Sequence, residues 1–338
     1  MKQVVPVSVA CILALPLVAI VVYSWVVPTP WQKFNENDQT GASNINPAEW
    51  MKYLSDDEQI NEVSIPGTHD SLSQLTNERP WYEQAFTSGN FNNGWAKTQG
   101  YSLKQQLERG VRSFHMRFDK NGYAYHGEDA NGVVSSYDIK EDGEHITYYE
   151  TMYTIASFLK QNKTEFVLPG DNILNYPGAS ADQAEIEKQF PGMISDDFYD
   201  KPTVGELRGH IVEHYANIST FESPFPRPGW NTLMWDAYKI WNGINKTLGS
   251  DDVSDPIESG GTYIEWISFT GWNILNMRNN PMQAAHFINN LVIGKCKQFA
   301  LKHDKKIGWW TFDTDYGDLE PNHNIAAAIY LVNDLNIN

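Results

Sequence analysis

Cysteine is scarce in this chain, and its scarcity excludes one common way of stabilising an exported protein. Only two cysteines occur among the 338 residues. Cys11 lies in an apolar N-terminal run. Cys296 shares a stripe of helical spacing with Leu291, Val292 and Phe299. We therefore expect no disulfide framework, and we interpret Cys296 as a buried apolar residue rather than a reactive thiol.

Positive charge is also in short supply. The chain has 25 Lys and Arg residues against 42 Asp and Glu residues, which gives a formal net charge of −17. Such a surface repels the phosphates of nucleic acid, so we expect no nucleic-acid partner. It is not attracted, on average, to an anionic bilayer either. Contact with lipid must therefore come from aromatic side chains, which make up 13% of the residues, or from local basic patches.

Charged residues are absent from Val4 to Val27, and only Lys2 precedes that stretch. A run of this length can cross a hydrocarbon core, which needs about 20 apolar residues. We expect residues 1–30 to be a signal anchor or a cleaved signal peptide, followed by a break at Pro28 and Pro30. The rest of the chain would then be secreted or membrane-anchored, on the extracytoplasmic side.

The body of the chain contains no internal repeat or low-complexity tract. Short apolar runs alternate there with amphipathic stretches, which predicts βα units and an α/β fold with a parallel sheet. Residues 45–338 fit a single (β/α) barrel domain, although an open doubly wound sheet would show the same pattern. A lead-in helix is expected around Pro47–Leu54, and Met152, Ile155 and Leu159 mark one face of a later helix. The expected strands are Glu62–Ile65, Val111–Phe118, Tyr123–His126, Glu165–Leu168, His210–Tyr215, Thr262–Phe269 and Ile307–Phe312.

Polar residues end several of these apolar runs. In a barrel the carboxyl ends of the strands carry the chemistry, so these residues are expected to converge. Two histidines can act as base and acid, and an arginine fork suits phosphate oxygens, so the inventory is that of a phosphodiesterase. The residues are His69, Asp70, His115, Arg117, His126, Asp171, Asp313 and Asp315.

The segment Ser64-Ile-Pro-Gly-Thr-His-Asp-Ser71 carries the strongest local signal. We expect Pro66 and Gly67 to turn the chain sharply out of the strand and to present His69 and Asp70 at its end.

This segment strongly resembles the signature of the phosphatidylinositol-specific phospholipase C catalytic (X) domain. The sequence Gly110-Val-Arg-Ser-Phe-His-Met-Arg117 and the preceding Trp95-Ala-Lys-Thr-Gln99 are similar to a second segment of the secreted bacterial members. Tyr125-His126-Gly127 matches the second catalytic histidine. Two later segments, Trp235-Asp-Ala-Tyr238 and Gly308-Trp-Trp-Thr-Phe-Asp313, also resemble family segments, and all five occur in the family's order.

The resemblance implies a distorted TIM barrel and a role for each matching residue. His69 would be the general base on the inositol 2-hydroxyl, oriented by Asp313. Arg117 would bind the phosphate, and His126, supported by Asp70, would protonate the diacylglycerol oxygen. The implied products are diacylglycerol and an inositol cyclic phosphate. Asp236 and Tyr238 would contact the inositol.

The triplet His115-Met-Arg117 indicates that no metal or other cofactor is needed. Calcium-dependent relatives place carboxylates on this strand, whereas Arg117 supplies a fixed positive charge. Bacterial members have an acid at the position of His115, to which we assign no catalytic role. They also have a Lys at the strand that here reads Phe166–Asp171 and an Arg at the strand that here ends Glu213–Tyr215. Both basic residues recognise inositol, and this chain has neither. The headgroup therefore stays open between phosphatidylinositol, a glycosylated (GPI-type) derivative and another phosphodiester lipid.

Two further residues have open interpretations. Asp171 would bind a substrate hydroxyl or a metal, or cap the next helix. Trp95 would contact the membrane interface or pack within the protein. The leading hypothesis is thus a monomeric phospholipase C acting at a membrane. The alternatives are a metal-dependent glycerophosphodiester or sphingolipid phosphodiesterase and a barrel that binds inositol lipids without catalysis.

Overall fold

The computed structural model describes residues 45–72, 99–124, 145–170, 177–195, 202–212, 220–221, 262–267 and 309–312, together with residues 333 and 335. The elements begin with the 3-10 helices η2 (Pro47–Tyr53) and η3 (Ile60–Glu62). The α-helices are α4 (Leu103–Glu108), α5 (Tyr148–Gln161), α6 (Ala179–Gln189) and α7 (Val204–Leu207). The strands are β1 (Ile65–Thr68), β2 (Ser113–Phe114), β3 (Ile194–Ser195), β4 (Ile211–Val212), β5 (Thr220–Phe221), β6 (Thr262–Ile267) and β7 (Trp309–Phe312).

These strands pair in parallel, as the alternation of the sequence predicts. Five of them form one sheet in the order β2-β1-β7-β6-β5, and β3 pairs with β4. Isolated parallel bridges from Ser113 to Leu168 and from Val167 to Ile211 connect β2 to β4. The result is an arc of parallel strands from β5 to β3. Among the described residues, no backbone pairing joins its two outer strands, β5 and β3.

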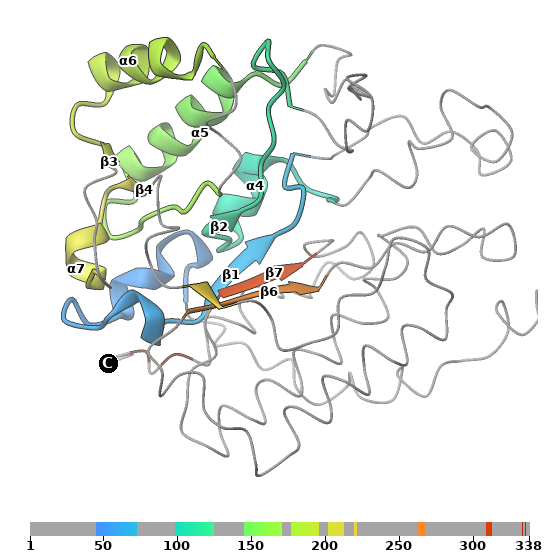
Figure 1. The fold of residues 1–338 in the computed structure, drawn as a ribbon. Coiled ribbons are helices and arrows are strands. Elements are labelled where there is room, and N and C mark those ends of the chain that lie inside the picture. The colour runs from blue at the N-terminus through green and yellow to red at the C-terminus, as the bar shows by residue number, and fades with distance from the viewer. Residues whose placement is uncertain are drawn as a thin grey trace, which may run out of the picture.

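The helices lie along one part of this arc (Figure 1). Helix α5 contacts both α4 and α6. It begins with a capping box, in which the Thr147 hydroxyl accepts from the Glu150 N–H and the Glu150 carboxylate accepts from the Thr147 N–H. Met152, Ile155 and Leu159 are fully buried, so the predicted apolar face is confirmed. No helix in the described ranges has the length and hydrophobicity to cross a membrane, and Val4–Val27 lies outside those ranges.

Three details of the expected elements were wrong. The first strand begins at Ile65, because Ile60–Glu62 form a 3-10 turn in which Gln59 and Glu62 make a capping box. Pro66 and Gly67 lie inside β1 rather than ending it, and the Pro66 carbonyl accepts a hydrogen bond from the Arg112 N–H. Tyr123 and Ala124 make antiparallel bridges instead of joining the parallel sheet.

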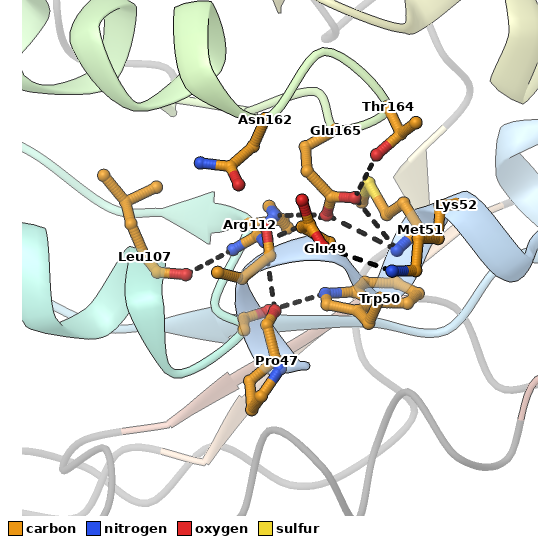
Figure 2. A network of polar contacts seen from close by, with 12 residues as sticks. Pro47, Glu49, Trp50, Met51, Lys52, Leu107, Arg112, Asn162, Thr164 and Glu165 are labelled. Atoms are coloured by element: carbon orange, nitrogen blue, oxygen red, sulfur yellow. Dashed lines mark hydrogen bonds and ion pairs between the residues drawn. The ribbon is translucent and has the colours of Figure 1, made fainter. Parts of the chain in front are cut away.

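A buried ion pair lies at the amino end of β2 (Figure 2). The Arg112 guanidinium is 2.9 Å from Glu165 Oε2, and both side chains have no exposed surface. Glu165 also accepts from the Met51 N–H at 3.1 Å. The remaining guanidinium N–H groups donate to backbone carbonyls of Leu107, Val111, Pro47 and Ala48. The pair thereby fastens η2, the expected lead-in helix, to the amino ends of the strands.

Candidate active site

The candidate site lies at the opposite, carboxyl ends of β1 and β2. His69 and Asp70 directly follow β1, and His115 and Arg117 follow β2. The two strands run parallel, with Thr68 paired to Phe114, so their ends meet at the same edge of the sheet. The convergence expected from the sequence is confirmed for these residues.

The backbone after β1 has an unusual conformation at Asp70. Its φ angle is +43°, and it is the one non-glycine residue with positive φ in the part of the chain that the structure describes. Aspartate tolerates this left-handed region better than most residues do, but at an energetic cost. Hydrogen bonds from Ser71 N–H to the His115 carbonyl (2.8 Å) and from His115 N–H to the Thr68 carbonyl (3.0 Å) hold the loop in place.

Three buried polar side chains fix this loop, and sequence reasoning gave none of them a role. Gln99 Nε2 donates to the His69 carbonyl at 2.6 Å. Gln106 Nε2 donates to the Ser71 carbonyl at 2.8 Å, and the Ser71 hydroxyl accepts from the His115 N–H at 2.9 Å. Gln99 ends the segment Trp95–Gln99, which resembles the secreted bacterial family members, and that resemblance could have pointed to a role for it. Ser71 ends the signature segment itself.

A buried carboxylate forms the centre of the site. Arg117 Nη2 lies 2.7 Å from Asp70 Oδ1, and His115 Nδ1 lies 3.2 Å from the same oxygen. His69 Nε2 lies 3.4 Å from Asp70 Oδ2. The Asp70 side chain is only 2% exposed. One carboxylate therefore holds a guanidinium and two imidazoles around it in a region of low dielectric, where such interactions are strong.

The two histidines stack on each other. Their ring centroids are 5.1 Å apart and their planes differ by 3°. Burial lowers the pKa of His115 from 6.5 to about 4, although its hydrogen bond with Asp70 opposes that shift. His115 is therefore neutral at neutral pH. Nδ1 of His115 lies between two groups of the same residue, 3.2 Å from Asp70 Oδ1 and 3.3 Å from the Asp70 N–H.

The sequence analysis placed His115 at the converging strand ends but assigned it no catalytic role. The structure places its imidazole beside Asp70, together with His69 and Arg117. The available signal was its position at a strand end, in the segment Gly110-Val-Arg-Ser-Phe-His-Met-Arg117. His69, Asp70 and His115 also form the one group of potential metal ligands found in the described residues.

The other predicted site residues lie outside the described residues, namely Trp95, His126, Asp171, Asp236, Tyr238 and Asp313. Strand β7 ends at Phe312, paired with Thr68, immediately before Asp313 in the sequence. Asp70 was expected to support His126. In the described part of the chain Asp70 contacts His69, His115 and Arg117, and its support of His126 stays a prediction.

Comparison with curated proteins finds bacterial relatives, whereas no family model matches the chain. The chain is 27% identical over 155 residues to a 1-phosphatidylinositol phosphodiesterase of Listeria monocytogenes, covering 45% of this chain and 42% of the relative. It is 24% identical over 218 residues to one from Staphylococcus aureus strain Newman, covering 57% and 65%. These matches span less than two thirds of either relative's length.

Comparison with solved structures covers more of the chain. The phosphatidylinositol-specific phospholipase C of Listeria monocytogenes matches with a TM-score of 0.58 at 19% identity, over 86% of this chain and 100% of that one. The chain has the bacterial phosphatidylinositol-specific phospholipase C fold. A mutant of the Staphylococcus aureus phospholipase C matches with a TM-score of 0.59 at 17% identity, over 86% and 97%. The distorted TIM barrel of these enzymes is therefore the fold of this chain, as expected.

Proposed function

We propose that this chain is a phosphodiesterase that cleaves phosphatidylinositol-type lipids into diacylglycerol and an inositol cyclic phosphate. One observation carries the proposal: His69 and Arg117 meet at the same buried carboxylate, Asp70, at the carboxyl edge of β1 and β2. A base and a fixed cation side by side are what a phosphoryl transfer requires. The similarity to bacterial 1-phosphatidylinositol phosphodiesterases supports the same activity.

In the proposed reaction His69 removes the proton of the inositol 2-hydroxyl. The resulting oxygen attacks the phosphorus and forms the cyclic diester. The bond from phosphorus to the diacylglycerol oxygen breaks, and His126 gives that oxygen a proton. Arg117 binds the non-bridging oxygens, on which negative charge increases. Asp70 and Asp313 stabilise the imidazolium that forms at His69.

The remaining assignments belong to the same proposal. Asp236 and Tyr238 would contact the inositol, and Asp171 a substrate hydroxyl. Trp95 would reach the membrane interface, since amphipathic rings favour that depth. The protein would be exported by way of residues 1–30, remain secreted or membrane-anchored, and act as a monomer.

The test is an assay of the full chain in detergent micelles that contain phosphatidylinositol and EDTA. Phosphorus NMR distinguishes a cyclic phosphate from an acyclic one. Cyclic phosphate released in EDTA would support the proposal. Activity that appeared only with added divalent metal would favour the metal-dependent phosphodiesterase instead. Binding of the lipid without turnover would indicate a non-catalytic barrel. Phosphatidylcholine micelles serve as the headgroup control.

A further inference from the structure

The group formed by His69, Asp70 and His115 has a second chemical capacity beyond acid/base catalysis. One ligand atom from each of the three residues lies within 4.8 Å of the other two. His115 Nδ1 is 3.2 Å from Asp70 Oδ1, and His69 Nε2 is 3.4 Å from Asp70 Oδ2. Nitrogen and oxygen ligands at about 2.0–2.1 Å from a tetrahedral zinc ion are themselves separated by about 3.4 Å. We propose that Zn²⁺ binds between these three side chains and blocks the site.

The chemistry of the three donors selects the type of ion. Two imidazoles and one carboxylate suit Zn²⁺ and similar transition metals, whereas Ca²⁺ and Mg²⁺ prefer a shell of oxygens. Three protein ligands leave a fourth position for water, as in open zinc sites. The two rings are nearly parallel, so one imidazole must turn about its side-chain torsions before both in-plane lone pairs point at one ion.

Arg117 weakens metal binding at this site but leaves one Asp70 oxygen for the ion. Its guanidinium contacts Oδ1 of Asp70, and the second carboxylate oxygen faces His69. Asp70 can therefore keep Arg117 on Oδ1 and offer Oδ2, which faces His69, to the ion. His115 Nδ1, which lies beside Oδ1, then completes the set of three ligands. Repulsion from the guanidinium weakens the binding of every cation, so the imidazoles supply most of the affinity. This again favours Zn²⁺ over oxygen-seeking ions.

The ion would act as an inhibitor rather than as a cofactor. Zn²⁺ on His69 uses the lone pair with which that imidazole removes a proton. The inhibitory part of the inference rests on the proposed function, because it needs His69 as the base. The binding part does not depend on lipid cleavage.

Binding is measured first, by calorimetric titration of Zn²⁺ into the full chain in non-ionic detergent at neutral pH. The protein carries no polyhistidine tag and is freed of EDTA beforehand. The wild type should bind one equivalent. Losing a residue that only supports a ligand costs about 10–100-fold in metal affinity, so loss of a ligand in His115→Gln should cost about 100-fold or more. His145→Gln is the matched control, since His145 stacks on Tyr123 rather than joining the cluster.

A second measurement does not depend on a variant. Co²⁺ bound to the wild type should give the intense visible absorption of a tetrahedral site, and Zn²⁺ should remove it while Ca²⁺ does not. No saturable zinc site in the wild type, or equal affinity in His115→Gln and His145→Gln, would overturn the proposal. In the lipid assay Zn²⁺ should lower the rate reversibly, and a higher rate with Zn²⁺ would contradict the blocking role. If the chain cleaves no lipid, the titration still decides whether the site exists.

Discussion

At the amino end of β2, the buried Arg112 guanidinium donates to Glu165 and to four backbone carbonyls, so that all its N–H groups have partners (Figure 2). At the carboxyl end of the same strand, the Asp70 carboxylate is shared by Arg117, His115 and His69. Both regions bury charge. In the first, Arg112 is bound by one carboxylate and four backbone carbonyls. In the second, every partner of Asp70 is a side chain that can bind a proton, a phosphate oxygen or a metal ion.

The comparison separates a structural charge from a chemical one. Arg112 and Arg117 stand five positions apart in one motif and serve opposite ends of the strand. Loss of the first should affect folding, and loss of the second should affect turnover. The predictions below test that division, beginning with the largest effect.

Replacing the base should have the largest effect. His69→Ala removes a proton-transfer partner and should lower the rate of phosphatidylinositol cleavage by about 10²–10⁴-fold. Steady-state assays in mixed micelles measure the loss. His145→Ala is the control and should keep nearly full activity. Turnover by His69→Ala close to that of the wild type would remove this residue from the mechanism.

Breaking the ion pair at the amino end should instead destabilise the protein. Arg112→Leu leaves the Glu165 carboxylate buried without its partner, which should lower the free energy of unfolding by about 3–5 kcal/mol. Burial already raises the pKa of Glu165, an effect that Arg112 opposes. Replacing both residues by Leu should cost less than the single change. Denaturant unfolding measures the free energy of unfolding of the single and the double variant. An equal loss in the two variants would contradict the account.

Because His115 is buried in its neutral form, we expect the free energy of unfolding to depend on pH. Its folded pKa of about 4 lies below the ordinary value of 6.5, so the unfolded chain takes up its proton first. The stability that this difference contributes is fully present above pH 6.5 and is lost as the pH falls toward 4. The expected loss is about 3 kcal/mol, and it should be absent in His115→Gln. Unfolding curves of both proteins across this range would show it, and parallel pH profiles would refute it.

The smallest predicted effect concerns the loop after β1. Gln99→Leu removes the hydrogen bond to the His69 carbonyl and should cost about 1 kcal/mol of unfolding free energy. It should also lower kcat, because the loop positions His69. Gln183→Leu removes a comparable bond to the Tyr148 hydroxyl between α5 and α6. This control should lose similar stability without a change in kcat, and a matching loss of kcat there would show that Gln99 has no positioning role.

The sequence was sufficient for the parallel architecture and for the convergence of His69, Asp70, His115 and Arg117, although it gave His115 no role. The spacing of apolar residues predicts α5 and the alternation of strands and helices, because the side chains that face the core recur with the period of the element. The motif around His69 and Arg117 identifies residues that the structure brings together. The boundaries of β1 were missed because a capping box converts Ile60–Glu62 into a helical turn.

Long-range polar contacts could not be predicted in the same way. The bond from Gln99 to His69 spans 30 positions, and that from Arg112 to Glu165 spans 53. Neither leaves a periodic signal. The contact of His115 with Asp70 depends on the left-handed backbone at Asp70, which no propensity rule assigns to that position. The predicted roles of His126 and Asp313 stay predictions.

The most direct test of the account is the rate at which the wild type and Arg117→Lys release inositol cyclic phosphate from phosphatidylinositol in EDTA. A guanidinium fork stabilises the phosphate oxygens without any metal, and an ammonium cannot reproduce its geometry. The account predicts turnover by the wild type and severe loss in Arg117→Lys, with both proteins folded. Equal rates in EDTA, or no cyclic product from either without a divalent ion, would contradict it.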